Sequence, residues 1–251
     1  MPKQIRSAIG IDQVRVLENI QDRPITSRRR TGRCFWYDDF ENYTAVITEK
    51  WQQSGGTVAL STAFPKQDKQ CMLLTTGAGA GNQAIARIIM GSFPLGRFGI
   101  EFDFYSYNAA GIAAFQEVPY IGIRFVDLTW DCYAYLRYLG GANMLWQYFN
   151  QAAAWANVPN GGYDRVEVGD FVAAIPNYHN FKMVADFDTG YYVGLWIDSA
   201  YFNLEALQMD RTARVVADEL VLQVDIGVRT TAAGGAVTMY VDNIILTDQE
   251  P

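Results

Sequence analysis

Residues 178–204 read YHNFKMVADFDTGYYVGLWIDSAYFNL and carry the clearest structural pattern in the chain. Two apolar runs, 179–187 and 191–197, are separated by Asp188-Thr189-Gly190, and the second run ends at Asp198-Ser199. Runs of this length, rich in aromatic and β-branched residues and bounded by Asp and Gly, are typical of strands joined by tight turns. The stretch therefore predicts an antiparallel hairpin.

The same pattern of short apolar runs between turn residues continues through most of the chain from residue 34 onward. Many short strands with turn signals between them predict an all-β sandwich or barrel. The connection over 150–177 is irregular, and a short helix over 151–156 fits there. No internal repeat is visible. The further strands expected are 57–60, 71–75, 84–90, 99–107, 120–127, 133–139, 144–149, 220–228 and 236–247.

The composition is that of a folded globular protein. Of the 251 residues, 50% are hydrophobic and 14% aromatic, so the chain is long enough for one large all-β domain or two small ones. No apolar run approaches the roughly 20 residues that a membrane span needs. The N-terminus lacks the continuous apolar core of a secretory signal, so we expect a virion or cytoplasmic location.

Cysteine and histidine offer little chemistry. The cysteines Cys34, Cys71 and Cys132 cannot all pair with one another, and their wide spacing has no metal-ligand pattern. We therefore expect buried free thiols. The single histidine, His179, has no identifiable partner for a Ser/His/Asp or Cys/His constellation. An enzyme built on this sequence would have to depend on carboxylates.

Charge is distributed unevenly along the chain. The net charge is −7, but residues 1–33 carry eight Lys or Arg against three Asp or Glu, so this segment is +5 and the remainder is −12. We interpret residues 1–33 as a basic, extended N-terminal arm that ends in Arg28, Arg29, Arg30 and Arg33. This run is either a solvated linker or a surface that docks on an acidic neighbouring subunit, on nucleic acid or on another anionic surface. The acidic body is not expected to bind nucleic acid.

Three segments resemble one superfamily of β-sandwich proteins. The hairpin over 178–204, the stretch VTMYVDNIILTD over 237–248, and Asp38-Asp39-Phe40-Glu41 with Trp51 ten residues on are similar to the central hairpin, closing strand and first strand of concanavalin-like and laminin-G-like jelly rolls. The resemblance implies an all-β, antiparallel two-sheet jelly-roll sandwich over residues 34–251, preceded by the arm. The superfamily includes lectins, glycosidases, adhesion modules and virion proteins, so the resemblance predicts fold better than function.

The resemblance also implies a structural calcium ion. In sugar-binding members the ion is held by the Phe-Glu segment of the first strand and the Asp of the last strand, which correspond by position to Glu41 and Asp242. Hard oxygen ligands suit Ca²⁺, but the ion takes about six to eight of them and the sequence provides two. The alternative is that Asp242 binds a turn or caps a strand end through hydrogen bonds. No other cofactor is expected.

The strand expected over 99–107, GIEFDFYSY, alternates carboxylates with aromatic residues. Phe102 and Phe104 fall on one face, and Glu101 and Asp103 on the other. The acidic pair resembles the first half of the Glu-x-Asp-x-x-Glu motif of retaining β-glucanases, but Ser106 stands in place of the second Glu. Retaining hydrolysis needs two suitably spaced carboxyl groups, one of them a proton donor. We therefore expect a solvated strand face rather than half of an active site.

Aromatic residues are concentrated between residues 130 and 155. Sugar-binding proteins stack aromatic rings on pyranose faces, so Trp130, Tyr133, Tyr135 and Trp146 are the candidates for a carbohydrate platform. Tyr133 and Tyr135 share one strand face by the two-residue period. The alternative is that these rings fill the space between the sheets or an interface.

Two functions compete on these observations. The first is a non-enzymatic structural protein of an assembly, a virion component of the capsid surface, decoration or tail. Its arm would contact neighbouring copies in a homo-oligomer, or other virion proteins, through arginine–carboxylate pairs. The alternative is a carbohydrate-binding, lectin-like module, and both can coexist in a virion protein that binds glycans. A carboxylate-dependent glycoside hydrolase comes third, because its best motif lacks an acid.

Overall fold

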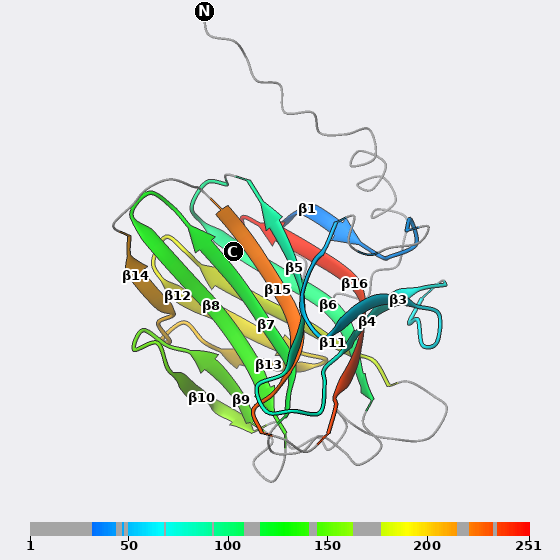
Figure 1. The fold of residues 1–251 in the computed structure, drawn as a ribbon. Coiled ribbons are helices and arrows are strands. Elements are labelled where there is room, and N and C mark those ends of the chain that lie inside the picture. The colour runs from blue at the N-terminus through cyan, green and yellow to red at the C-terminus, as the bar shows by residue number, and fades with distance from the viewer. Residues whose placement is uncertain are drawn as a thin grey trace, which may run out of the picture.

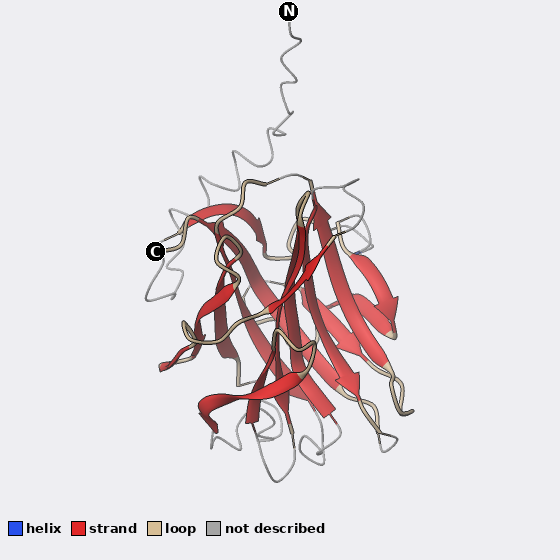
Figure 2. Cartoon of the chain, turned by 90° about the vertical axis from the view of Figure 1, so that its left-hand side faces the viewer, coloured by secondary structure: helices blue, strands red, loops and turns tan. Residues whose placement is uncertain are grey.

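The computed structural model describes residues 32–43, 47, 50–67, 69–91, 93–107, 116–140, 145–162, 177–214, 221–232 and 235–251. Over these residues the chain forms 16 strands, arranged as two antiparallel sheets that face each other (Figures 1 and 2). The expected all-β antiparallel two-sheet sandwich is confirmed. In this part of the chain no helix is both long and apolar enough to cross a membrane.

Sheet A forms the layer behind in Figure 1 and contains the strands of the quoted hairpin. The hairpin strands pair from Phe181 with Ile197 to Asp186 with Tyr191, as the turn residues between them predict. The strand order in sheet A is β13 (Ala200–Asn203), β12 (Tyr191–Ile197), β11 (His179–Asp186), β6 (Arg97–Tyr107), β16 (Thr238–Asp248), β4 (Cys71–Thr75) and β3 (Thr57–Ser61), with β1 (Arg33–Asp38) also pairing with β16.

Sheet B forms the front layer in Figure 1. The long strand β8 is paired on one edge with β7, and two shorter strands share its other edge: β14 pairs with the first half and β9 with the second. The strand order in sheet B is β10 (Trp155–Gly162), β9 (Leu145–Phe149), β8 (Trp130–Leu139), β7 (Gln116–Val126), β15 (Val221–Thr230), β5 (Gln83–Met90) and β2 (Gln52–Gly55), with β14 (Asp210–Ala213) pairing with β8.

The hydrophobic core lies between the two sheets and is rich in aromatic rings. Phe102 of sheet A packs on Phe181 at 4.9 Å between ring centroids, and Phe181 packs on Trp146 of sheet B at 5.6 Å. Burial of each such side chain contributes roughly 1.5–3 kcal/mol. The three cysteines are free thiols as expected; Cys71 and Cys132 are buried, whereas Cys34 is half-buried.

Most expected strands form close to their predicted bounds, but the helix expected over 151–156 does not. The side chain of Asn150 accepts hydrogen bonds from the backbone N–H groups of Ala152 and Ala154, and Ala153 has a φ of 51°. This tight turn reverses the chain between β9 and β10, so that Trp155 pairs with Phe149. An Asx-type turn of this kind competes with a helix for the same backbone groups.

The first described strand begins within the expected arm. β1 starts at Arg33 and pairs with β16, so that Arg33 lies opposite Asp248. The Arg33 guanidinium binds the Asp248 carboxylate through two hydrogen bonds, with Nε 2.9 Å from Oδ1. Arg33 therefore pairs within its own chain, and its contact with a neighbouring subunit stays a prediction. Arg28, Arg29 and Arg30 lie outside the described residues.

Candidate functional site

The outer face of sheet B is polar and aromatic, whereas its inner face is apolar. Along β8, Ala134 and Leu136 are buried in the core, and Tyr133 and Tyr135 project from the opposite face. This alternation follows from the two-residue period of a strand. The shared face expected for Tyr133 and Tyr135 is confirmed.

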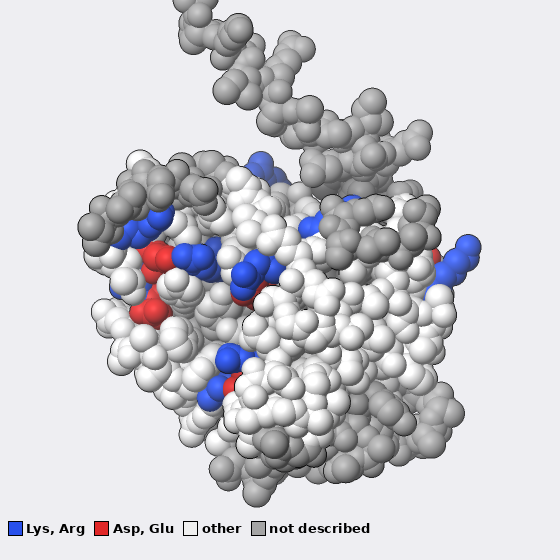
Figure 3. Space-filling model, in the orientation of Figure 1, with Lys and Arg blue, Asp and Glu red and all other residues white. Residues whose placement is uncertain are grey.

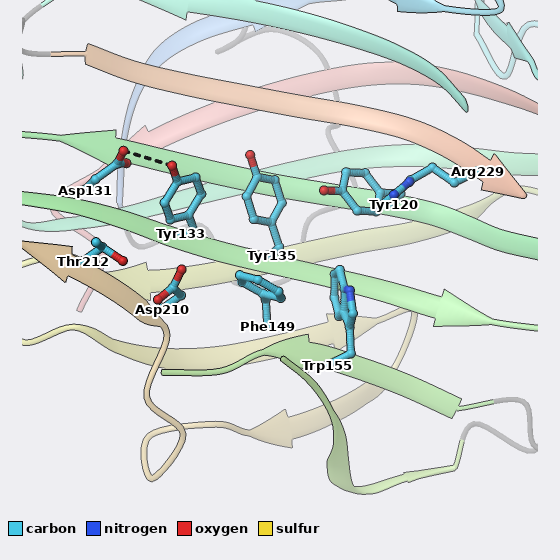
Figure 4. Close-up of a pocket in the computed structure, with 9 residues that line it drawn as sticks. All are labelled: Tyr120, Asp131, Tyr133, Tyr135, Phe149, Trp155, Asp210, Thr212 and Arg229. Atoms are coloured by element: carbon cyan, nitrogen blue, oxygen red, sulfur yellow. Dashed lines mark hydrogen bonds between the residues drawn. The ribbon is translucent and has the colours of Figure 1, made fainter. Parts of the chain in front are cut away.

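A pocket of about 530 Å³ opens on this outer face (Figure 4). Its size falls within the range of about 300–1,000 Å³ typical of ligand pockets. Side chains from six strands of sheet B converge there, although these strands are far apart in sequence. The lining residues are Tyr120, Asp131, Tyr133, Tyr135, Phe149, Trp155, Asp210, Thr212 and Arg229.

Gly122 makes room for the tyrosine at the centre of the pocket. Tyr135 lies opposite Gly122 in the β7–β8 register, and a Cβ atom on Gly122 would lie 1.5 Å from Cε1 of the Tyr135 ring. The ring therefore lies flat across the strand and carries its hydroxyl to Asp225, where it donates a hydrogen bond of 3.1 Å to Oδ2. Only glycine allows this placement, because any other residue would put a side-chain atom inside the ring.

Aromatic rings form a continuous row through the pocket (Figure 4). Tyr135 is stacked against Tyr133 at 5.9 Å and against Tyr120 at 5.6 Å between centroids. Phe149 and Trp155, the paired residues of β9 and β10, form the adjoining side and lie 5.3 Å apart. Offset stacks and edge contacts of this kind are favourable arrangements for aromatic rings. They hold the row rigid while half-buried rings still line the open pocket.

Basic and acidic side chains lie next to one another on the face of the molecule that Figure 3 shows. Arginine–carboxylate pairs of sheet B lie beside the aromatic row. Arg124 binds Asp131 through two hydrogen bonds, 2.9 Å from Nε to Oδ1 and 2.6 Å from Nη2 to Oδ2. Asp131 also accepts a hydrogen bond of 2.9 Å from the hydroxyl of Tyr133. Bidentate guanidinium–carboxylate contacts fix both planes, so this acid is held in one orientation.

Burial raises the pKa values of one acid and of three tyrosines in the pocket. Burial raises the pKa of Asp210 above its ordinary value, and the neighbouring Asp131 carboxylate raises it further. Burial also raises the pKa of Tyr120 to about 12, and it raises the pKa values of Tyr133 and Tyr135. These tyrosines therefore act at neutral pH as protonated rings that donate hydrogen bonds.

The structure separates the four residues expected to form a carbohydrate platform. Tyr133 and Tyr135 line the pocket. Trp130 is half-buried, packs against the core side of sheet B and is covered by the Arg211 guanidinium at 4.5 Å. Trp146 is fully buried between the sheets, at 0% exposure, and so cannot stack on a ligand at the surface. The alternative of core packing is correct for Trp146.

Seven of the nine lining residues, Asp131 among them, are not among the four platform candidates singled out from the sequence. Phe149 and Trp155 belong to the aromatic-rich region but were not singled out, because the strand of Trp155 was assigned to an irregular segment and Phe149 pairs with it only once the turn at Asn150 is known. Tyr120 and Arg229 lie on strands whose faces alternate, so periodicity could have placed them outward. Asp210 and Thr212 belong to a four-residue strand with no apolar pattern.

Glu41 and Asp242 bind the same loop, between β3 and β4, but their contacts do not fit calcium. Glu41 accepts hydrogen bonds of 2.8 Å from the backbone N–H groups of Lys69 and Gln70. Asp242 accepts hydrogen bonds from those of Lys66 and Gln67, at 3.0 and 3.2 Å. A calcium ion needs oxygen lone pairs, whereas two loop N–H donors already bind Oε1 of Glu41 and two bind Oδ2 of Asp242. Within the described ranges, no group of three or more His, Cys, Asp or Glu could hold a metal.

Glu101 and Asp103 lie on the outer face of sheet A, the sheet opposite the pocket. Both are buried, so the expected solvated face is wrong. The reason is that β6 lies in the middle of the sheet between β11 and β16, and the β3–β4 loop places the Lys66 ammonium 2.6 Å from Asp103. Asn243 also donates a hydrogen bond of 3.0 Å to this carboxylate. Through these contacts Asp103 holds the β3–β4 loop against sheet A.

No protein-family model and no curated protein sequence match this chain. Among solved structures, one reported with the endo-acting O-glycanases of the human gut microbiota aligns at a TM-score of 0.50 and 10% identity, over 87% of this chain and 100% of that chain. The endo-β-1,4-glucuronan lyase of the fungus Trichoderma reesei aligns at 0.47 and 11%, over 86% and 96%. The lectin UEA-II in complex with galactose aligns at 0.46 and 8%, over 85% and 98%.

At these identities the likeness is one of fold. The two antiparallel sheets and the alignment at a TM-score of 0.50 show a concanavalin-like jelly-roll sandwich fold, as the hairpin and the closing strand predict. Proteins that bind glycans and proteins that cleave them both share this fold, so function must be argued from the pocket.

Proposed function

We propose that this protein is a carbohydrate-binding, lectin-like module that holds a glycan in the pocket on the outer face of sheet B. The observation that carries the proposal is the rigid row of aromatic rings in an open pocket, flanked by carboxylates and guanidinium groups. A pyranose presents apolar C–H faces, which pack on aromatic rings, and a rim of hydroxyls, which need paired polar groups.

The polar groups of the pocket suit hydroxyl recognition. The Asp210 carboxyl and the Thr212 hydroxyl lie at one end of the aromatic row, beside Tyr133, and offer polar groups to a ligand (Figure 4). The hydroxyls of Tyr133 and Tyr135 donate to Asp131 and Asp225 and can still accept a hydrogen bond. The bidentate pair of Arg124 with Asp131 needs no rearrangement before a sugar binds. A preformed site loses less conformational entropy on binding than one that must first be ordered.

Binding is favoured over hydrolysis by the state of the two pocket acids. Asp131 and Asp210 lie on neighbouring strands and face the same pocket, and the raised pKa of Asp210 would suit a proton donor. A hydrolase also needs a second carboxylate available as nucleophile or base. Asp131 is already engaged by Arg124 and Tyr133, which lowers its reactivity. Glycoside hydrolysis is therefore the second candidate, and release of reducing ends from bound polymers would establish it.

An assembly role for the basic segment stays a prediction. Arg28, Arg29 and Arg30 lie outside the described residues, and Arg33 is bound to Asp248 of the same chain. The solved structures to which the chain is similar include lectins and glycan-cleaving enzymes, and they support the carbohydrate alternative better than a virion role.

The proposal is tested by a glycan-array screen of the purified chain, with calcium and with EDTA, followed by titration of any retained polymer. Replacing Trp155 with alanine should weaken binding about tenfold or more, equivalent to about 1.4 kcal/mol. Tyr201→Ala is the matched control, because Tyr201 is an exposed aromatic residue, at 46% exposure, on the opposite sheet. A screen that retains no glycan in either buffer, or equal binding by wild type and Trp155→Ala, would refute the proposal.

A further inference from the structure

One end of the pocket has more positive than negative charge. Glu117 of β7 is the shared partner of two guanidinium groups, those of Arg137 and Arg229. Arg137 hydrogen-bonds Oε1 of this carboxylate directly, whereas Nη1 of Arg229 lies 3.6 Å from Oε2. The second separation is longer than a hydrogen bond. One carboxylate thus faces two cations, and only one of the cations is fully engaged.

The other arginines on the same face are matched one to one. Arg124 forms a bidentate pair with Asp131, and Arg87 forms one with Asp225 at 2.7 and 3.0 Å. Counting the charges of these described pairs, each sums to zero, while the group around Glu117 sums to +1. The excess belongs to the pocket itself, because Arg229 lines it.

Burial determines which of the two arginines can meet a ligand. The side chain of Glu117 is 1% exposed and that of Arg137 is 14% exposed, whereas that of Arg229 is 34% exposed. The Arg229 guanidinium lies over the Tyr120 ring, 4.8 Å from its centroid (Figure 4). It is therefore held in place beside the aromatic row, with part of its edge open to the pocket.

An indole ring also lies close to this position. Trp155 lies 6.1 Å from Tyr120 between centroids, and the Arg137 guanidinium covers it at 4.1 Å. Arg137 does not line the pocket, so a sugar ring would pack on the part of Trp155 that does, and would present its substituents toward Tyr120 and Arg229. A planar carboxylate is the substituent that a guanidinium binds best, because two parallel N–H donors match its two oxygens.

We propose that the ligand of this pocket is an acidic glycan, in which a uronate residue packs on Trp155 and its carboxylate binds the Arg229 guanidinium. This inference rests on the proposed carbohydrate-binding function and names its substrate class. At the opposite end of the pocket the residues that line it are Asp210, Thr212 and Asp131, which suit the hydroxyls of the neighbouring sugar. The pocket thus has a direction, with the anionic substituent at the end formed by β7 and β15.

The test uses soluble polyuronates, namely polymers of glucuronate, galacturonate and mannuronate, each alongside the same polymer after reduction of its carboxyl groups to primary alcohols. Affinities are measured by calorimetry for the full chain. We expect at least one polyuronate to bind about tenfold or more tighter than its reduced form, since charge-assisted hydrogen bonds are the stronger class. The preference should shrink as salt is raised.

The variant Arg229→Gln should lose about tenfold to hundredfold in affinity for the polyuronate and should lose clearly less in affinity for the reduced polymer. Arg97→Gln is the charge-matched control, because Arg97 pairs with Asp186 on sheet A. Arg229→Lys, which keeps the charge, should recover part of the loss. Circular dichroism and thermal melting verify that each variant is folded.

The outcomes separate the two proposals. Equal or tighter binding of a reduced polymer, or an unchanged preference in Arg229→Gln, overturns the acidic-glycan inference. If a polymer binds the wild type and this binding is lost in Trp155→Ala, the carbohydrate-binding function stands. If neither the charged nor the reduced polymers bind, and the glycan screen also fails, both proposals are overturned.

Discussion

Replacing Gly122 with alanine tests whether the flat placement of Tyr135 organises the pocket. The new Cβ atom would lie 1.5 Å from Cε1 and 1.7 Å from Cδ1 of the Tyr135 ring. Carbon atoms in contact are separated by about 3.5 Å, so the ring must move by about 2 Å. Such a movement carries the hydroxyl away from Asp225, which it contacts at 3.1 Å.

Two costs add in this variant. Forcing an extra methyl group into a packed site costs about 1–3 kcal/mol. Losing a hydrogen bond to a carboxylate costs about 1.5–3 kcal/mol. Because the ring can relax in part toward solvent, we expect a loss of about 2–4 kcal/mol in the free energy of unfolding, or about 4–16 °C in Tm for a chain of this size. Glycan affinity should fall as well, since Tyr135 lines the pocket.

Chemical denaturation of four proteins measures the effect: wild type, Gly122→Ala, Tyr135→Ala and the double variant. In the absence of the ring the new methyl group meets no obstacle, so Gly122→Ala should cost little in the Tyr135→Ala background. The cycle then gives a coupling of about 2 kcal/mol or more. Gly91→Ala is the control, because no atom lies within 4 Å of its new Cβ. A Gly122→Ala protein as stable as Gly91→Ala would show that Tyr135 does not depend on the glycine.

Two further predictions concern the core and the loop anchor. Trp146→Ala should lower the free energy of unfolding by about 3–5 kcal/mol, because the residue is fully buried. Trp155→Ala should lower it much less. Equal losses of the two variants in denaturant titrations would contradict the assignment of Trp146 to the core and Trp155 to the pocket. Burial raises the pKa of Asp242 from 3.8 to about 7, so the folded chain keeps a proton that the unfolded chain releases. The stabilisation that protonated Asp242 contributes is complete below a pH of about 4 and is lost as pH rises through about 7. Over this range the free energy of unfolding falls by at most about 1.4 kcal/mol per pH unit. Asp242→Asn should reduce the dependence of the free energy of unfolding on pH between pH 5 and 8. If the variant keeps the same pH dependence, another group causes it.

Local pattern predicted the strands with good accuracy. The runs 71–75 and 191–197 match β4 and β12 residue for residue, because each is apolar along its length and is followed by turn residues. The turn after β9 was mistaken for a short helix, since an alanine-rich segment has helical propensity. There the Asn150 side chain, bound to the N–H groups of Ala152 and Ala154, outweighed that propensity.

The site was predictable only in part. The two-residue period placed Tyr133 and Tyr135 on one face, but periodicity alone could not decide which face of a strand points to the core. Trp146 shows the difference, since it is as aromatic as the pocket residues and lies fully inside the core. The contacts of Glu41 and Asp242 were out of reach for a related reason, because both carboxylates bind backbone groups of a loop that no motif describes.

The sequence by itself determined the fold class, since strand periods and turn residues act over a few neighbouring positions and do not depend on distant partners. It also determined which residues of β8 share a face. Only the tertiary structure decided the pocket, because its residues come from six strands whose register is set by pairing between distant segments. The excess positive charge at Arg229 is likewise a tertiary property. Folding brings Arg137 and Arg229 to the same carboxylate, that of Glu117, and buries the ion pair of Arg137 with Glu117, whose charges cancel.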